Sequence, residues 1–487
     1  MTSLIIPSQL IILLPGIMGS ALQQNGRDLW AISRQGVAEG LLSLGSSLNQ
    51  LALHDDDISH DDIGDGITAH RLLPDIWNIP SVSKGSGYET IIRRLESELR
   101  MSRGDIASPQ PHQNFFPFPY DWRRDIRVTA DQLRRFVEFQ LPRWRDHCGK
   151  KDAKVILIAH SMGGLVARAY VELLGGWKVT EALFTLGTPH RGSPNALETI
   201  SNGLSFRKGP IGLRLRDLTT VLRTFTSIYQ LLPIYPLIIG DDQPLRIVDA
   251  ADIPNLDSTR AQQARTVLLD IDNAAQRNRN NPQYATQTVP IVGVWQDTYQ
   301  SASRRSDGGI ALHYEPPMGL PTDFAGGDGT VPQLSAIPIA IQEQGVNTPI
   351  FVIQHHGWLP NGTNVLTPLI EQIKYLVSRH SLPTRGTLAR GQQAINARVA
   401  DLYASDEPVV VTAQVLNTPE EFQPLVARIR SLADGRTRRE PFIQTNEAWV
   451  LTVEGLTPGL YEIEIRPANP AGTGLEPMTS AFDVAMV

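Results

Sequence analysis

The chain has 487 residues, of which 41% are hydrophobic and 19% are charged, a composition typical of a globular protein with a large apolar core. Its 44 basic and 50 acidic residues leave a formal net charge of −6, which argues against nucleic acid as a partner. The single cysteine, Cys148, excludes a disulfide within the chain and fits a reducing cytoplasm, where we expect this protein.

The first apolar segment, MTSLIIPSQLIILLPGIMGS, lacks the basic start of a signal peptide, because the first Lys or Arg is Arg27. We interpret residues 10–14 as a buried strand that runs into a tight turn at Pro15-Gly16. No apolar run reaches the roughly 20 residues that a membrane span needs. We therefore expect a soluble protein, and contact with a membrane or lipid surface stays open.

Strands and helices alternate along residues 1–385, as in a mostly parallel sheet covered by helices. Apolar runs such as KVILIAH and VPIVGVW predict buried strands, and GLVARAYVELLGG predicts a helix between them. A helix is also predicted over VTADQLRRFVEFQLPRWRDH, with Thr129 and Gln132 as a capping box at its start. Residues 194–285 interrupt the alternation, and either an inserted cap or an ordinary buried helix explains them.

The pattern changes after a linker that we predict at residues 386–400. Short alternating segments separated by Pro and Gly then predict a small all-β sandwich of Ig-like style over residues 401–487. Nothing in this sandwich carries chemistry, so its partner stays unknown. We expect a chain cut after about Ser381 to keep measurable activity.

An acidic stretch, HDDDISHDDIGDG, covers residues 54–66. A calcium-binding EF-hand loop needs Gly at its sixth position and Glu at its twelfth. Counted from Asp55, these positions hold His60 and Gly66. We therefore interpret the stretch as a solvated acidic loop.

A nucleophile elbow is the strongest feature of the sequence. The apolar run KVILIA leads directly into His160-Ser161-Met162-Gly163 and then into a predicted helix. In the α/β-hydrolase fold this sharp turn lifts a serine hydroxyl above the sheet, and Ala159, in place of the usual glycine, is still small. A serine that merely caps the helix is the alternative. We expect Ser161 to be the nucleophile.

The acid and the base follow the serine in the chain order of this fold. Asp328 lies between Gly327 and Gly329 in GGDGTVP and is the candidate acid, with a turn-forming aspartate as the alternative. His355 and His356 follow the last apolar run, and we favour His356 as the base, with His355 as the alternate.

Two backbone N–H groups should form an oxyanion hole. Met162 follows the nucleophile directly, and its N–H is the first candidate. Ile17 follows the Pro15-Gly16 turn after the first predicted strand, and its N–H is the second. An ordinary glycine-rich turn is the alternative interpretation of this segment.

Together these motifs resemble the lecithin:cholesterol acyltransferase family. The matching pieces occur in the family's order and cover most of residues 10–380: LPGIMGSAL, FPYDWRRD, AHSMGGLVAR, TLGTPHRGSP, GDGTVP and the late histidine. The resemblance implies a triad of Ser161, Asp328 and His356, with Ile17 and Met162 as oxyanion donors. It implies transfer of acyl groups from lipids through an acyl-serine to water or another alcohol, with no metal or organic cofactor.

The chain departs from this pattern in three ways. A single cysteine excludes the lid disulfide of animal members, the membrane-spanning start of plant and yeast acyltransferases is missing, and residues 400–487 are not part of the common pattern. A soluble bacterial-type member is the nearest resemblance, and the natural acyl acceptor cannot be carried over.

We therefore expect a serine-dependent acyl hydrolase or acyltransferase that acts on lipid or other carboxylic esters. A non-catalytic lipid-binding protein on a hydrolase scaffold is one alternative. An amidase that uses the same triad is the other.

Overall fold

The structure is a computed structural model of the chain. It describes residues 7–31, 49–74, 77–79, 83–85, 87–204, 218–240, 242–320, 325–342, 349–378, 393–416, 424–445, 448–469 and 475–486. Residues 205–217 of the predicted cap and 386–392 of the predicted linker lie outside these ranges.

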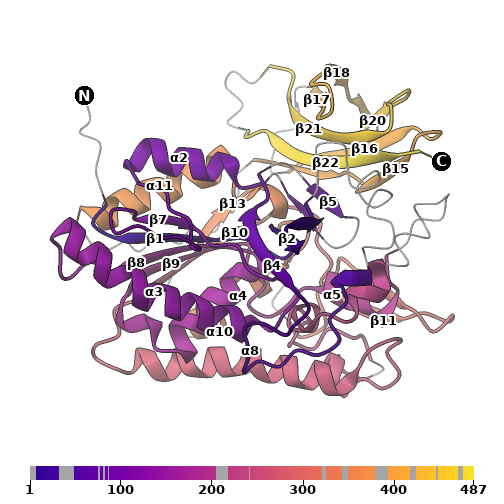
Figure 1. Ribbon diagram of the computed structural model, residues 1–487. Coiled ribbons are helices and arrows are strands. Elements are labelled where there is room, and N and C mark those ends of the chain that lie inside the picture. Colours follow the sequence, from indigo (N-terminus) through magenta and orange to yellow (C-terminus); the bar gives the residue numbers. More distant parts are fainter. Residues whose placement is uncertain are drawn as a thin grey trace.

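A parallel sheet forms the centre of the larger part of the molecule (Figure 1). Its strands follow one another across the sheet as β13 (Ile350–Val352), β10 (Gln287–Gly293), β9 (Thr180–Leu186), β8 (Val155–His160), β1 (Leu10–Leu14) and β7 (Phe115–Pro117). All five pairs of neighbours are parallel. Since neither face of β8 meets water, this strand can be apolar from Val155 to Ala159, and His160 at its end is its one polar residue.

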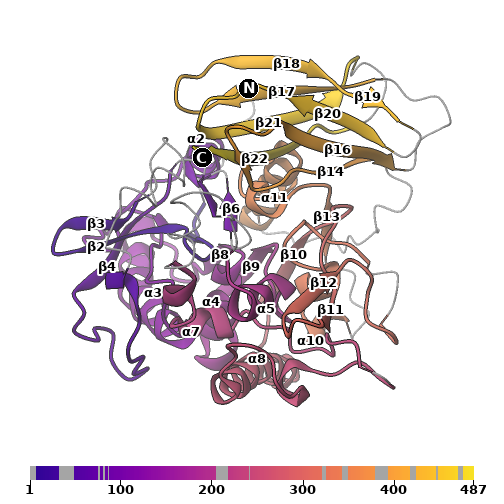
Figure 2. The same cartoon turned by 90° about the vertical axis from the view of Figure 1, so that its right-hand side faces the viewer.

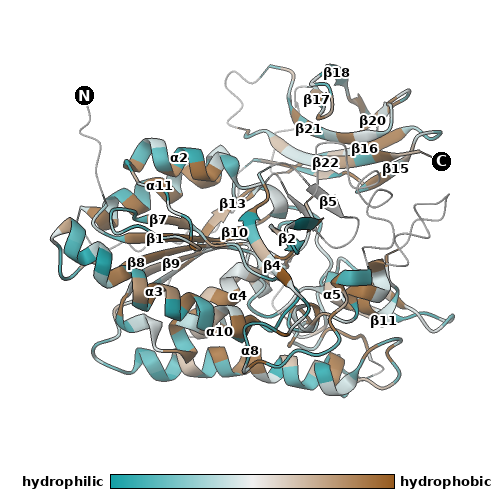
Figure 3. Cartoon of the chain, viewed as in Figure 1, coloured by the Kyte–Doolittle hydropathy of each residue, from teal (hydrophilic) through white to brown (hydrophobic). Residues whose placement is uncertain are grey.

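Helices cover both faces of this sheet. α2 (Glu89–Leu99) and α11 (Thr363–Val377) lie on one face, and α3 (Ile126–Cys148), α4 (Met162–Arg168) and α8 (Ser258–Arg279) lie on the other (Figure 1). Strand β1 divides its side chains accordingly: Leu10, Ile12 and Leu14 belong to one hydrophobic cluster, whereas Ile11 and Leu13 belong to the other. Figure 3 shows the apolar strands between helices whose hydrophilic sides face outwards.

This arrangement is the α/β-hydrolase fold that the elbow motif predicts. The nucleophile strand β8 lies near the middle of the sheet, and the segments with the candidate acid and base follow strands on one side of it. The expected fold class is therefore confirmed for the central sheet and its helices.

The start of α3 differs from the prediction. The helix begins at Ile126, and Asp125 is its N-cap, with a side chain that accepts a hydrogen bond from the N–H of Arg127. Thr129 therefore lies inside the helix and is buried, so the predicted capping box of Thr129 and Gln132 is wrong. An aspartate cap gives the same stabilisation four residues earlier.

Two β-sheets form a sandwich at the C-terminal end, which confirms the all-β prediction (Figure 1). One sheet contains β14 (Ala394–Arg398), β16 (Val409–Leu416), β20 (Trp449–Val453) and β19 (Ile443–Gln444). The other contains β15 (Leu402–Ala404), β22 (Met478–Ala485), β21 (Gly459–Pro467), β17 (Leu425–Ser431) and β18 (Thr437–Pro441). We call these nine strands the C-terminal sandwich.

The first strand of the C-terminal sandwich begins earlier than predicted. β14 pairs with β16 and lies inside the segment 386–400 that we predicted as a linker, so that prediction is wrong over β14. The hydroxyl of Tyr461 donates to the carbonyl oxygen of Thr457 (2.7 Å), a contact of the kind found at the tyrosine corner of Ig-like sandwiches.

The acidic loop after residue 54 is held by two arginines of the YDWRR segment. Arg124 is buried and donates to the carboxylate of Asp56 and to the carbonyl oxygens of Asp57, His60 and Asp61. The guanidinium of Arg123, also buried, binds Asp65 and Asp121. Two guanidinium groups thus anchor the loop, while most of its residues are exposed, as predicted for a solvated acidic loop.

Candidate active site

Ser161 lies at the sharp turn between β8 and α4, with φ 52° and ψ −127°. This backbone conformation is strained for any residue with a side chain, and strain of this kind concentrates at nucleophile elbows. Gly163 lets the turn close, because a Cβ there would lie 2.3 Å from the carbonyl oxygen of Pro15. Ser161 is therefore held in place by the packing of neighbouring strands and helices.

The structure brings Ser161, His356 and Asp328 together. Nε2 of His356 lies 2.9 Å from Oγ of Ser161, and Nδ1 of His356 lies 2.7 Å from Oδ2 of Asp328. An ionised carboxylate can only accept, so the hydrogen-bond network assigns the ring proton to Nδ1. Nε2 then faces the serine hydroxyl with its lone pair, as a general base requires.

The two adjacent histidines face different neighbours. His356 opens the 3-10 turn η6 (His356–Trp358) and makes the contact with Ser161. His355 lies against Gly329, where a Cβ would come within 2.9 Å of its Nδ1. Both side chains are buried, but only His356 joins Ser161 to Asp328.

Asp328 is fixed on both of its oxygens. Oδ1 accepts hydrogen bonds from the N–H groups of Thr330 (3.0 Å) and Val331 (2.7 Å), which leaves Oδ2 for His356. Its carbonyl oxygen also accepts from the N–H of His356 (2.8 Å). The acid and base segments are therefore joined by a backbone hydrogen bond as well as by their side chains.

Two glycines make room for this pair. At Gly187, which has φ 57°, a Cβ would lie 2.7 Å from Oδ2 of Asp328 and 3.0 Å from Nδ1 of His356. At Gly293, a Cβ would lie 2.4 Å from that of Asp328. Neither glycine was singled out from the sequence, although Gly187 stands in the quoted TLGTPHRGSP motif.

The turn after β1 approaches the serine closely. A Cβ on Gly16 would lie 2.8 Å from the Cβ of Ser161, so only glycine fits there. Ile17 lines a pocket together with Ser161 and His356. Within the described part of the chain, the N–H groups of Ile17 and Met162 donate no hydrogen bond to other residues. Ile17 and Met162 therefore stay the candidate donors to a ligand atom near Ser161.

Tyr88 and His160 connect this turn to the histidine segment, and sequence reasoning missed this connection. The Tyr88 hydroxyl accepts from the N–H of Gly16 (2.7 Å) and lies 2.9 Å from Nδ1 of His160. Nε2 of His160 lies 3.1 Å from the carbonyl oxygen of His356. Because a carbonyl only accepts, Nε2 carries the proton and Nδ1 accepts from Tyr88.

Both members of this connection are buried and uncharged. Burial, assisted by the nearby His356, holds the pKa of His160 well below its ordinary value. Burial likewise raises the pKa of Tyr88. A neutral imidazole and a neutral phenol keep the donor and acceptor roles that the three hydrogen bonds require.

A narrow pocket of about 40 Å³ opens beside Ser161. α5 (Pro194–Ser201) contributes Ala196 and Thr199, and α7 (Thr226–Tyr229) contributes Ile228. Leu231 and Val331 add further apolar surface. The lining thus combines apolar side chains with polar ones such as Ser193 and Asn195, and it includes the serine and the histidine.

No group of three or more His, Cys, Asp or Glu side chains in the described ranges could hold a metal ion. None of the helices in those ranges combines the length and apolar character of a membrane span.

Residues 109–285 match the family model described as lecithin:cholesterol acyltransferase. This stretch includes Ser161, while Asp328 and His356 lie beyond it. No curated protein sequence matches the chain.

Among solved structures, the Bacillus licheniformis lipase BlEst2 in its propeptide form is 11% identical over 98% of this chain and 94% of its own, with a TM-score of 0.32. Phospholipase PlaB from Legionella pneumophila in complex with thio-NAD is 9% identical over 98% of this chain and 92% of its own, with a TM-score of 0.24. The family match confirms the resemblance that the motifs predict: over residues 109–285, this chain is similar to the lecithin:cholesterol acyltransferase family.

Proposed function

We propose that the protein is a serine-dependent acyl hydrolase or acyltransferase that acts on lipid or other carboxylic esters. The observation that carries this proposal is the hydrogen-bonded triad of Asp328, His356 and Ser161, of which the serine and the histidine line a partly apolar pocket. The similarity to the lecithin:cholesterol acyltransferase family supports lipid esters as the substrate class.

In the proposed reaction, Oγ of Ser161 attacks the ester carbonyl carbon while its proton passes to Nε2 of His356. Asp328 stays ionised, keeps the imidazole in the required orientation and stabilises the positive charge that forms on it. The N–H groups of Ile17 and Met162 donate to the oxygen that becomes negative.

The tetrahedral intermediate then collapses and the bond to the leaving alcohol breaks. That alcohol takes the proton from Nε2 of His356, and the acyl group remains on Ser161. Water or a second alcohol attacks the acyl-serine, again with His356 as the base, and the serine is restored. Hydrolysis and transfer differ only in this acceptor.

The segment 194–285 is the proposed cap of this site. It supplies Ala196, Thr199, Ile228 and Leu231 to the pocket, so its side chains would contact the acyl chain. The alternative interpretation, ordinary core, fits α8, which covers one face of the sheet, whereas the residues of the segment that line the pocket all precede α8.

A fluorophosphonate probe tests the proposal, since it reacts with activated serines. Wild-type protein should be labelled and should cleave p-nitrophenyl esters, and Ser161→Ala should lose both properties while keeping its fold. Ser227→Ala, at a buried serine on α7, is the matched control and should keep both. Labelling or turnover that persists in Ser161→Ala would exclude the assigned nucleophile.

The same assay separates the alternatives. A wild-type protein that binds lipid but is neither labelled nor active would be a binding protein on a hydrolase scaffold. Turnover of amide analogues as fast as that of the matching esters would identify an amidase.

A further inference from the structure

We propose that the C-terminal sandwich is a positioning element of the active site: it holds the segments that carry His356 and Asp328 through two separate contacts. The proposal rests on the proposed function, because it concerns residues that matter only if those two side chains act on Ser161. In this proposal the sandwich supports catalysis by positioning His356 and Asp328, and none of its own side chains takes part in the reaction.

The first contact is made by the turn that carries His356. Trp358, the last residue of η6, is 5% exposed and forms a hydrophobic cluster with Leu460 of β21 and Ala481 of β22. The partly buried Leu432 packs against the same cluster. The indole is two residues from His356, and the N–H of Trp358 donates to the carbonyl oxygen of His355 (2.9 Å). Displacement of the indole would therefore move the turn.

The second contact is made by β14, which Figure 2 shows on the side of the sandwich nearest the central sheet. The side-chain amide of Gln296 donates to the carbonyl oxygen of Ile395 (3.1 Å). Asn396 binds Asp297 twice: it accepts from the N–H of Asp297 (3.3 Å) and donates to its Oδ1 (3.0 Å). Arg398 adds an ion pair with the carboxylate of Asp297.

Gln296 connects β14 to the loop that carries Asp328. Its N–H donates to the carbonyl oxygen of Gly327 (3.0 Å), directly before Asp328. The hydroxyl of Thr298 donates to the carbonyl oxygen of Gln296 (2.8 Å) and accepts from the N–H of Gly329 (2.8 Å). The residues on both sides of Asp328 are thus hydrogen-bonded to the segment that β14 holds.

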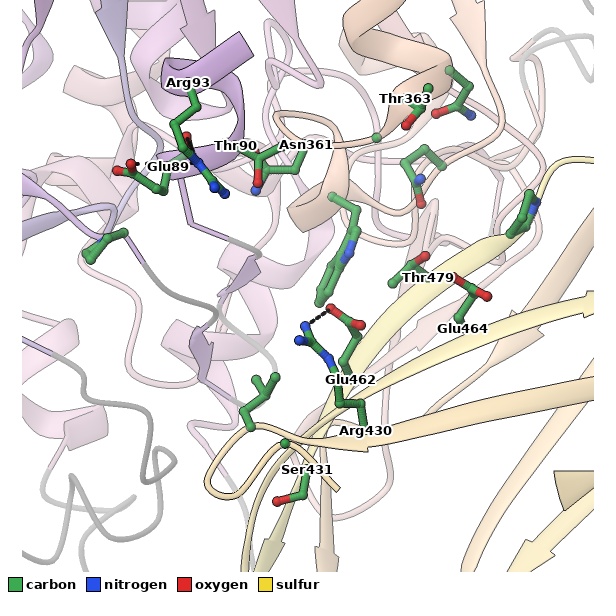
Figure 4. Close-up of a pocket in the computed structure, with 18 of the residues that line it drawn as sticks. Glu89, Thr90, Arg93, Asn361, Thr363, Arg430, Ser431, Glu462, Glu464 and Thr479 are labelled. Carbon is green, nitrogen blue, oxygen red and sulfur yellow. Dashed lines mark hydrogen bonds and ion pairs between the residues drawn. The ribbon is translucent and has the colours of Figure 1, made fainter. Parts of the chain in front are cut away.

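A polar groove of about 1140 Å³ next to the first contact separates the two parts of the molecule (Figure 4). Asn361 and Thr363 lie on its one wall, and Arg430 and Glu462, which form an ion pair (3.0 Å), lie on the other. Because the groove keeps the two walls apart, the burial of Trp358 is a local contact and not part of a continuous apolar interface.

These contacts argue against our expectation that a chain cut after about Ser381 stays active. Such a chain would expose Trp358 and remove the carbonyl acceptor of Gln296. A displacement of about 1 Å in a catalytic group can lower turnover by about a hundredfold. A truncated chain that simply fails to fold would be uninformative, however, so point substitutions are the better test.

The test compares two leucines of the sandwich that differ in what they touch. Leu460 is 1% exposed and packs on Trp358, whereas Leu451 is 2% exposed and lies in the internal core of the sandwich. Leu460→Ala should lower kcat for a p-nitrophenyl ester by about tenfold, with KM changed less than about twofold, and should slow fluorophosphonate labelling equally. Leu451→Ala should leave both rates near those of the wild type.

Two further variants complete the experiment. Leu460→Met restores the buried volume and should restore kcat, which a change unrelated to packing would not produce. Asn396→Leu removes both bonds to Asp297 and should lower kcat in the same way as Leu460→Ala. All variants are assayed at a temperature where circular dichroism shows them folded.

The outcomes separate this inference from the proposed function. If the wild type is active and labelled, but Leu460→Ala and Asn396→Leu behave like Leu451→Ala, the positioning role is wrong and the proposed function stands. If the wild type is neither labelled nor active, the proposed function itself fails.

Discussion

The two halves of the candidate active site are built differently. Ser161 follows a central strand and begins a buried helix, so its position is determined by the interior of the sheet. Asp328 and His356 lie on short loops, and their neighbours Gln296 and Trp358 are in contact with the C-terminal sandwich. The nucleophile thus depends on packing within the hydrolase part, whereas the acid and base lie on segments that also contact the C-terminal sandwich.

This difference shows which catalytic side chains a distant substitution can displace. A turn that is enclosed by strands cannot move without opening the core, which is packed at the density of an organic crystal. Loops have fewer neighbours, and a hydrogen-bonded side chain on a loop is only as well placed as the loop itself. Three changes sharpen the comparison.

The largest effect is expected at the histidine pair. His356→Ala removes the group between Ser161 and Asp328 and should lower kcat by about a millionfold, the scale seen when the histidine of such a triad is lost. His355→Ala should change kcat by less than about tenfold, because His355 packs on Gly329. Steady-state ester hydrolysis measures both. A larger loss in His355→Ala would reverse the assignment of the base.

A smaller effect is expected at Tyr88, which joins the oxyanion turn to His160. Tyr88→Phe keeps the ring but leaves the N–H of Gly16 and Nδ1 of His160 without the hydroxyl. We expect kcat to fall by about tenfold with little change in KM, since the loss affects alignment rather than substrate binding. Tyr461→Phe loses the two bonds of its hydroxyl to Thr457 in the sandwich and is the matched control. Equal kcat values for the two variants would argue against a positioning role for Tyr88.

The smallest effect is a pH dependence of stability. Burial holds the pKa of His160 well below its usual range, and burial together with Arg168 and Arg191 does the same for the pKa of His190. Both rings stay neutral in the folded protein, whereas the unfolded chain takes up protons near pH 6.5. The free energy of unfolding should therefore fall below about pH 6.5, by up to about 1.4 kcal/mol per pH unit and ring.

Urea unfolding at pH 7.5 and pH 5.5 measures this dependence. His190→Gln removes one buried ring and should flatten the fall, whereas His54→Gln, on the exposed acidic loop, should leave it unchanged. A fall that is equally steep in His190→Gln would mean that other groups are responsible.

Local patterns were enough to predict the elements of the hydrolase fold. The elbow at Ser161 can be predicted from the sequence because strand, turn and helix follow one another within a few residues. The central strands can be predicted because both of their faces are covered, which makes each of them a nearly continuous apolar run. Asp328 was singled out as the candidate acid by its flanking glycines, and Gly329 has φ 89°.

Features that depend on distant residues were not predictable in this way. The contact of His356 rather than His355 with Ser161 follows from how loops far apart in the sequence meet. Tyr88 stands 72 residues from His160, and no local signal marks it. The ion pairs of Arg428 and Arg430 on β17 with glutamates of β21 likewise depend on which strands become neighbours.

The acidic loop is organised around a positive charge that belongs to the chain itself. The guanidinium of Arg124 donates four hydrogen bonds to this loop. The acceptors are the carboxylate of Asp56 and the carbonyl oxygens of Asp57, His60 and Asp61. A guanidinium carried by the chain itself occupies the centre that a calcium-binding loop would reserve for its cation. Loss of that one side chain would leave these four oxygens without their donor and release this part of the loop, as a chelator releases a calcium-binding loop by removing its ion.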